Sequence, residues 1–158
     1  MTRKESGMSA ESPLHVVAAV IIHAGNILGC RRASHKESPG LWEFPGGKVE
    51  IGESPREALR REIAEELSLE LVPWRRLDKS VTKVSESLSI ELECWVIVVD
   101  HAPDLISADH DAFIWLKPEE LSQYAWAKPD LPAVEKLNAQ SDLQTLLAKL
   151  SDPSLSLD

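Results

Sequence analysis

The chain has 158 residues and a formal net charge of −9, with 43% hydrophobic and 27% charged residues. This length suits one domain with a hydrophobic core, and the composition is that of an ordinary globular protein. The acidic surplus argues against a nucleic-acid polymer as a partner, because such a partner favours a basic patch. A small phosphorylated ligand stays compatible with it, since metal ions can bridge acidic protein and acidic ligand.

The sequence predicts a cytoplasmic protein without a membrane partner, as a monomer or a homodimer. No run approaches the roughly 20 apolar residues of a membrane span, and the first residues lack the apolar segment of a secretory signal. We predict a single domain at 14–150, with a disordered lead at 1–13 and a flexible tail at 151–158. Cys30 and Cys94 have no metal-type spacing and are predicted to be buried thiols.

The first part of the chain predicts strands. Residues 15–23 (HVVAAVIIH) form an apolar run rich in β-branched residues, which is typical of a buried strand. Turn residues at 24–26, followed by ILGCRR, predict a hairpin. A polar loop is expected at 33–40, and the brief strand LWEF at 41–44 leads into a loop that begins Pro45-Gly46-Gly47.

A helix is predicted to begin after Ser54. Pro55 suits the first helical position, and Glu57 stands where a capping box places its glutamate. Apolar residues recur at i, i+4 and i+8 from Leu59, so the helix should bury one face and reach about Leu67.

The remaining chain predicts further strands and then helices. An edge strand is expected near 76–83, a long strand at 88–99 that enters a buried sheet, and another strand at 112–116. A short helix at 118–124 and one or two helices within 131–150 follow. This order predicts an α/β sandwich with a mixed β-sheet between helices.

Three glutamates lie close together on the predicted helix, at Glu62, Glu65 and Glu66. Like charges at this spacing cost a few tenths of a kcal/mol per pair. A solvated helix face or a cation site would each explain them, and hard oxygen ligands without cysteine or histidine suit Mg²⁺ or Mn²⁺. Arg61 is expected to reach Glu57 and Glu65, each four residues away.

The segment before the helix favours the cation site. Gly46 and Gly47 permit close approach of the backbone to a ligand. Glu53 adds a fourth carboxylate where the chain enters the helix.

Residues 47–69, GKVEIGESPREALRREIAEELSL, resemble the signature of the Nudix hydrolases. That signature is Gly, five residues, Glu, seven residues, Arg-Glu, an aliphatic, any residue, Glu-Glu, any residue, Gly and an aliphatic. The matching residues are Gly47, Glu53, Arg61, Glu62, Ile63, Glu65, Glu66 and Leu69. The single departure is Ser68, where the family has glycine. It is expected to cost about 1 kcal/mol at the helix C-cap and to remove no ligand.

Segments 40–50 and 115–137 also resemble the MutT-type nucleoside triphosphate pyrophosphohydrolases of that family, in particular the branch that acts on CTP. The resemblance covers roughly residues 14–138 and implies the Nudix α/β/α fold. It implies hydrolysis of a small nucleoside triphosphate to a monophosphate and pyrophosphate. Two alternatives stay open: removal of oxidised guanine nucleotides, and a non-catalytic nucleotide-binding regulator. An acidic interaction module would leave the glycine–glutamate register unexplained.

The resemblance also implies roles for the acidic residues. The ligands of Mg²⁺, with Mn²⁺ as the alternative, would be the Gly46 carbonyl and the carboxylates of Glu62, Glu65 and Glu66. Glu53 would support this site or bind a bridging ion, and Arg61 would orient the carboxylates. Which glutamate is the general base stays open. Asp109 stands where the MutT pattern carries a further glutamate ligand, although it could equally be an ordinary loop acid.

Substrate contacts are implied for Arg32, Phe44, Gly47 and Lys48, with a plain surface arginine as the alternative for Arg32. Asp130 stands where the branch that acts on oxidised guanine has asparagine. A carboxylate can accept a hydrogen bond from an exocyclic amine such as cytosine N4, which favours a cytosine nucleotide or a modified relative. Asp130 could also cap the helix that follows it.

Other aromatic and histidine side chains give weaker signals. The residues that could stack on a base or belong to the core are Phe113, Tyr124 and Trp126. The histidines predicted to be loop residues without a partner are His35, His101 and His110.

Overall fold

The computed structural model describes residues 12–140, 142–152 and 154. Most of the predicted lead and tail therefore lies outside the described residues. The strands are β1 (Leu14–His23), β2 (Asn26–Arg32), β3 (Trp42–Glu43), β4 (Gly46–Lys48), β5 (Arg75–Lys83), β6 (Ser89–Val98) and β7 (His110–Leu116). The helices are α2 (Pro55–Leu67), α3 (Leu131–Asn138) and α4 (Leu143–Leu150), with 3₁₀ helices η1 (Pro118–Gln123) and η2 (Lys128–Asp130).

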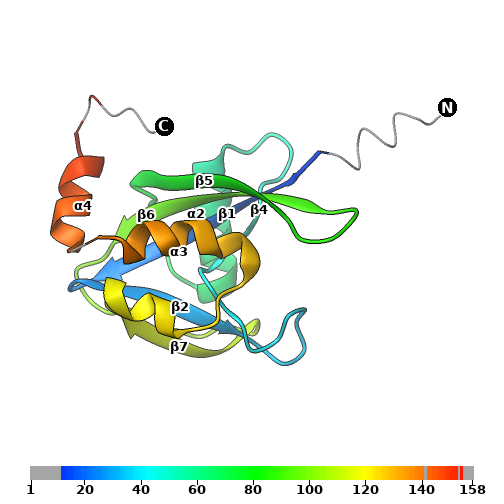
Figure 1. Ribbon diagram of the computed structural model, residues 1–158, viewed down its shortest axis with the longest axis horizontal. Coiled ribbons are helices and arrows are strands. Elements are labelled where there is room, and N and C mark those ends of the chain that lie inside the picture. The colour runs from blue at the N-terminus through cyan, green and yellow to red at the C-terminus, as the bar shows by residue number, and fades with distance from the viewer. Residues whose placement is uncertain (1–11, 141, 153, 155–158) are drawn as a thin grey trace.

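The seven strands form one mixed sheet (Figure 1). Its main path has the order β3-β2-β1-β6-β5, while β4 pairs with β1 and β7 pairs with β2. The central pair β1–β6 is parallel, and every other pair is antiparallel. β5 lies at the end of the main path, so the predicted edge strand is confirmed.

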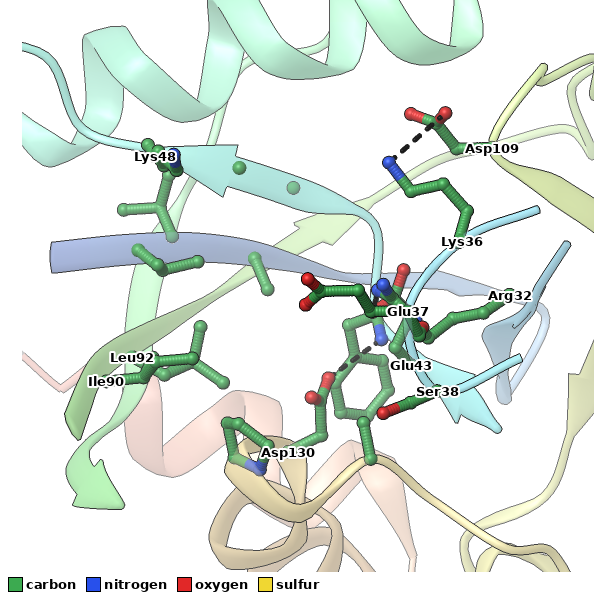
Figure 2. A pocket seen from close by; sticks show the side chains of 18 of the residues that line it. Arg32, Lys36, Glu37, Ser38, Glu43, Lys48, Ile90, Leu92, Asp109 and Asp130 are labelled. Carbon is green, nitrogen blue, oxygen red and sulfur yellow. Dashed lines mark hydrogen bonds and ion pairs between the residues drawn. The ribbon is translucent and has the colours of Figure 1, made fainter. Parts of the chain in front are cut away.

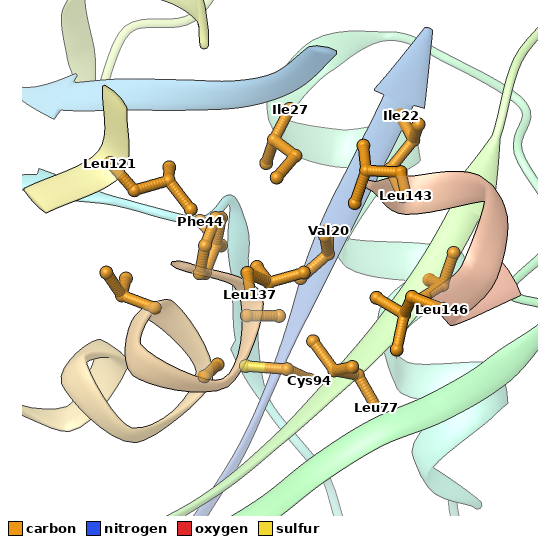
Figure 3. Packing of buried hydrophobic residues seen from close by; sticks show 14 of the residues in the cluster. Val20, Ile22, Ile27, Phe44, Leu77, Cys94, Leu121, Leu137, Leu143 and Leu146 are labelled. Atoms are coloured by element: carbon orange, nitrogen blue, oxygen red, sulfur yellow. The ribbon is translucent and has the colours of Figure 1, made fainter. Parts of the chain in front are cut away.

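Helices cover both faces of this sheet, which confirms the predicted sandwich. Alternate residues of a strand point to opposite faces. On one face of β1, a cluster with α2 contains Val17, Ala19 and Ile21. Val20 and Ile22 pack in the other, with Leu137 of α3 and Leu146 of α4 (Figure 3). The continuous apolar run of β1 is thus explained by burial on two faces. Both cysteines are buried free thiols, as predicted.

Local signals account for both ends of α2. The Ser54 Oγ accepts a hydrogen bond from the Glu57 N–H at 3.1 Å, and the Glu57 carboxylate accepts one from the Ser54 N–H at 2.9 Å. This is the predicted capping box. At the other end Ser68 is left-handed, with φ 58° and ψ 36°, and its N–H donates to the Ala64 carbonyl at 3.1 Å.

Replacing Ser68 with glycine should raise the free energy of unfolding by about 0.5–1 kcal/mol, because glycine enters the left-handed region without strain. Ala139 provides a matched control at the C-cap of α3, where φ is −76° and the backbone is right-handed. There the change to glycine should lower stability, because glycine gains freedom in the unfolded chain. Urea unfolding measures the free energies of unfolding of both variants. A loss of stability in Ser68→Gly would contradict the prediction.

The structure corrects two predictions. The stretch expected to be a loop contains β4, whose glycines pair with β1 at Val17↔Gly47 and Ala18↔Gly46. Glycine is a poor strand former, so local composition gives no sign of this strand. His110 is not a loop residue, because β7 begins two residues earlier than expected and its side chain is fully buried. His35 and His101 lie in turns and bends, as predicted. No helix in the described part of the chain is long and apolar enough to cross a membrane.

Candidate active site

A cleft of about 640 Å³ opens between β1, β4, β6, the C-terminal half of α2 and the loops beside β2 and β7 (Figure 2). It collects most of the residues singled out from the sequence. Those that line it are Arg32, Phe44, Gly46, Gly47, Lys48, Glu62, Glu66, Asp109 and Asp130. Glu53, Arg61 and Glu65 are not among its lining residues and lie beside it on or next to α2.

The two glycines of β4 allow the acidic end of the cleft to form. A Cβ on Gly46 would lie 1.9 Å from the Val17 carbonyl oxygen, so no other residue fits there without a shift of the strands. A Cβ on Gly47 would lie 2.2 Å from the Glu62 carboxyl carbon. The Glu62 carboxylate therefore lies directly against the backbone of β4.

Arg61 organises the carboxylates beside the cleft. Its Nε and one terminal nitrogen bind both oxygens of Glu53, at 2.6 and 2.9 Å. The other terminal nitrogen donates to Glu62 at 3.0 Å and to Glu65 at 3.2 Å, and a further bond reaches the Lys48 carbonyl at 3.0 Å. The hydrogen bonds from Arg61 are the main cause that lowers the pKa of Glu53 to about 2.

One predicted partner of Arg61 is wrong. The Glu57 carboxylate accepts a hydrogen bond from the Ser54 N–H in the capping box. No bond between Glu57 and Arg61 is observed in the described residues. Glu65 is the i+4 partner that Arg61 does bind, and its side chain stays 62% exposed.

Glu66 is half-buried on α2 and lines the cleft. Its pKa is raised to about 8, mainly by burial and also by the negative charges of Glu43 and Asp109. Among the described residues its buried Oε1 has no hydrogen-bond partner. An unpaired buried carboxylate is costly unless a cation or a proton compensates it. Asp109 lines the same part of the cleft, where it pairs with Lys36 at 3.5 Å.

Three residues of the site were missed from the sequence, Lys36, Glu43 and His110. The Glu43 carboxylate binds Arg32 through one oxygen at 2.8 Å and His110 through the other at 2.9 Å. Glu43 lines the cleft (Figure 2), whereas His110 is not among the lining residues and its side chain is fully buried. An extension of the predicted strand 112–116 by two residues would have placed His110 on a strand, but nothing in the sequence pairs it with Glu43.

The far end of the cleft is closed by a buried acid. Asp130 is only 6% exposed, and its Oδ2 accepts a hydrogen bond from the Phe44 N–H at 2.9 Å. Burial raises its pKa to about 8, with a smaller upward contribution from the Glu43 charge. The alternative that Asp130 caps α3 is wrong, because its side chain makes no capping bond. Ile90 and Leu92 supply an apolar wall nearby (Figure 2).

The candidate aromatic platforms belong to the packing of the protein. Trp126 packs on Phe44 with ring centroids 4.9 Å apart and donates to the Leu121 carbonyl. Tyr124 meets Trp42 edge-on, and Phe113 packs against the cluster around α2. None of the three lines the cleft, whereas Phe44 does.

A cleft with a carboxylate-rich end and an apolar wall, set in an α/β/α sandwich, is suited to a ligand that joins a phosphate chain to a base. A model of the NUDIX domain matches residues 13–145. The chain therefore belongs to the Nudix family of hydrolases, and the expected family and fold are confirmed.

Named relatives agree with this assignment. The chain is 40% identical over 130 residues to a CTP pyrophosphohydrolase of Escherichia coli, covering 80% of this chain and 92% of that protein. It is 34% identical over 116 residues to a putative 8-oxo-dGTP diphosphatase 2 of Mycobacterium tuberculosis, covering 73% and 81%. The solution structure of the E. coli ORF135 protein superposes with a TM-score of 0.72 at 35% identity, covering 91% of this chain and 97% of that one.

Nudix hydrolases generally use divalent metal ions, and the residues present fit such an ion. The donors are hard oxygens, and the unpaired Oε1 of Glu66 is available to a cation. Among the described residues, no three acidic, histidine or cysteine side chains converge closely enough to hold a metal ion by themselves. Mg²⁺ commonly binds through one or two carboxylates and completes its shell with water and phosphate oxygens. Glu62 and Glu66, which both line the cleft, are the carboxylates that could serve in that mode of binding.

Proposed function

We propose that this chain is a Mg²⁺-dependent pyrophosphohydrolase that cleaves a (deoxy)nucleoside triphosphate to the monophosphate and pyrophosphate. A cytosine or modified base is the proposed specificity. The main support for this proposal is that one cleft contains both the α2 carboxylates Glu62 and Glu66 and the buried Asp130. The name of the E. coli relative, CTP pyrophosphohydrolase, supports both the reaction and the base.

The roles of the residues follow from their positions. A bound divalent ion neutralises phosphate charge and lowers the pKa of a water molecule. Glu62 and Glu66 line the cleft and would hold such ions. Glu65, predicted as a further ligand, does not line the cleft and binds Arg61, so we propose that Glu65 and Glu53 support the ion site through Arg61 instead. Arg32, Lys36 and Lys48 line the cleft and provide positive charge toward the phosphate chain. Asp109, held by Lys36, is proposed as a further ligand.

Asp130 is proposed to recognise the base. With a pKa of about 8 it carries a proton at neutral pH, so it can donate one hydrogen bond and accept another. Cytosine requires that combination, because its N3 accepts and its N4 amino group donates. Guanine presents two neighbouring donors instead, at N1 and N2, which suit an ionised carboxylate.

The preference for CTP over GTP should therefore fall at least about fourfold as the pH rises from about 6.5 to about 8.5, because a pKa of about 8 lowers the protonated fraction of Asp130 by about that factor. Above its pKa Asp130 loses the proton that cytosine N3 needs. The measurement is the ratio of the kcat/KM values for CTP and GTP. The titration of the α2 carboxylates affects both nucleotides alike and therefore cancels in this ratio. Asp130→Asn is the control, because its amide donates and accepts at every pH. An equal slope in both proteins would contradict the assignment.

A substrate panel with Mg²⁺ and detection of released pyrophosphate tests the reaction. Turnover of CTP or dCTP above purine triphosphates supports the proposal. Preference for 8-oxo-dGTP favours the alternative that the name of the M. tuberculosis relative suggests. Nucleotide binding without turnover, with Glu66→Gln identical to the wild type, leaves only the regulatory alternative. A cytoplasmic location, the absence of membrane and nucleic-acid partners, and a monomeric or dimeric state stay predictions.

A further inference from the structure

His110 is a fully buried polar side chain that the proposed chemistry does not use. It begins β7 and lies directly opposite Arg32 of β2 in the register of these strands. The register shifts by a β-bulge between Arg31 and Arg32. Bulges re-aim side chains and are frequent beside functional sites. The bulge thus brings Arg32 and His110 to one place, at the wall of the cleft.

Hydrogen bonds on both sides hold the His110 ring. The Glu43 carboxylate can only accept, so the proton lies on Nε2, which donates to Glu43 Oε2 at 2.9 Å. On the other side Nδ1 meets the Ser107 hydroxyl at 3.1 Å, and that hydroxyl oxygen accepts from the Asp109 N–H at 3.1 Å. Nδ1 thus has a hydroxyl partner that is itself held by the Asp109 backbone. Both ring nitrogens are satisfied in one fixed orientation.

The Glu43 carboxylate, held by His110, in turn restricts the orientation of the Arg32 side chain. Its second oxygen binds a terminal nitrogen of Arg32 at 2.8 Å, and the Arg32 Nε donates to the Glu37 carbonyl. Two of the three guanidinium nitrogens are thus held by the protein, while the side chain still lines the cleft and is 20% exposed. An arginine with a free carboxylate partner would sample several rotamers, whereas a carboxylate held on both sides restricts it.

We propose that His110 is a positioning residue for substrate binding. It fixes the Glu43 carboxylate, and Glu43 fixes the guanidinium of Arg32 where the phosphate chain of the nucleotide passes. The inference rests on the proposed function for its substrate, and it adds a contact chain, His110–Glu43–Arg32, that lies outside the α2 signature. Because Arg32 acts in binding, loss of His110 should raise KM more than it lowers kcat.

Two amide replacements of His110 separate positioning from packing. Glutamine can place its amide nitrogen near the position of Nε2 and donate to Glu43, whereas asparagine is too short to do so. Outer-sphere partners of this kind typically contribute about 10–100-fold to activity or affinity. We expect His110→Asn to raise KM about tenfold and His110→Gln to stay within about threefold of the wild type. His101→Asn is the matched control, because His101 also pairs with a carboxylate at 2.7 Å but is 84% exposed.

A double-mutant cycle tests the path through Arg32. In an Arg32→Ala background, His110→Asn should add less than about a twofold change, because the group that it positions is gone. Equal effects of His110→Asn in the two backgrounds would overturn the proposal. Equal losses in His110→Gln and His110→Asn would also overturn it, since only one of them can donate to Glu43.

An NMR measurement tests the same chain without turnover. The Arg32 Nε–H signal should be sharp and slow to exchange in the wild type and in His110→Gln, and broadened in His110→Asn. An unchanged signal in His110→Asn would show that Glu43 holds Arg32 without help. If the wild type hydrolyses no nucleotide, the proposed function fails, while this signal still decides whether His110 positions Arg32.

Discussion

Replacement of Glu66 by glutamine is expected to lower kcat about 10²–10⁴-fold, the range that a positioned proton acceptor or a comparable charged group contributes. The amide keeps the shape of the side chain but loses the negative charge that a divalent ion needs. Turnover of CTP with Mg²⁺ measures the effect. Glu65→Gln is the matched control, because Glu65 stays 62% exposed beside Arg61 and does not line the cleft. Glu65→Gln should lower kcat markedly less than Glu66→Gln does. An equal decrease of kcat in the two variants would contradict the assignment.

The same replacement should stabilise the protein in the absence of divalent ions. Burial and neighbouring charges raise the pKa of Glu66 from 4.5 to about 8. Between those two values the folded state holds a proton that the unfolded state has lost, so the stability contributed by this group falls as the pH rises. Glutamine does not titrate, and the free energy of unfolding of Glu66→Gln should therefore fall less between about pH 5 and pH 8. Urea unfolding in a chelator measures it. An identical pH slope in wild type and variant would contradict the burial of Glu66.

Alanine at the two glycines of β4 should separate stability from activity. On Gly46 the added Cβ would meet the backbone of β1, 1.9 Å from the Val17 oxygen, and neither strand can move without breaking their pairing. On Gly47 it would meet the end of the Glu62 side chain at 2.2 Å, which can rotate away. Gly46→Ala should therefore lower the free energy of unfolding by about 3 kcal/mol or more, within the range of severe packing and strain effects.

Gly47→Ala should change stability by about 1 kcal/mol or less but lower kcat/KM at least about tenfold, because a displacement of about 1 Å in a site can cost that much. Thermal unfolding and turnover of CTP measure the two effects. Gly25→Ala is a control for glycine replacement, since its Cβ would meet nothing within 4 Å and only its φ of 81° opposes the change. A folded, active Gly46→Ala enzyme would contradict the close pairing of β4 with β1.

The local sequence determined the features that depend on spacing within one element. The capping box of Ser54 and Glu57 begins α2 where the pattern placed it, and the left-handed Ser68 ends it. The acidic residues of α2 lie on neighbouring positions of one surface because helix geometry fixes their relative directions. The apolar run of β1 predicted a buried strand because burial on both faces excludes polar residues. These features need no knowledge of distant parts of the chain.

Contacts between residues far apart in the sequence were decided by the tertiary structure. His110 and Glu43 are 67 residues apart, and Asp130 and the Phe44 N–H that it binds are 86 apart. Their proximity follows from strand order, register and one β-bulge, none of which leaves a local pattern. The same holds for burial, which makes Asp130 and Glu66 weak acids although the sequence shows only two more carboxylates. The sequence by itself therefore determined α2 and its carboxylates, whereas the fold decided which of them face the cleft and what surrounds them.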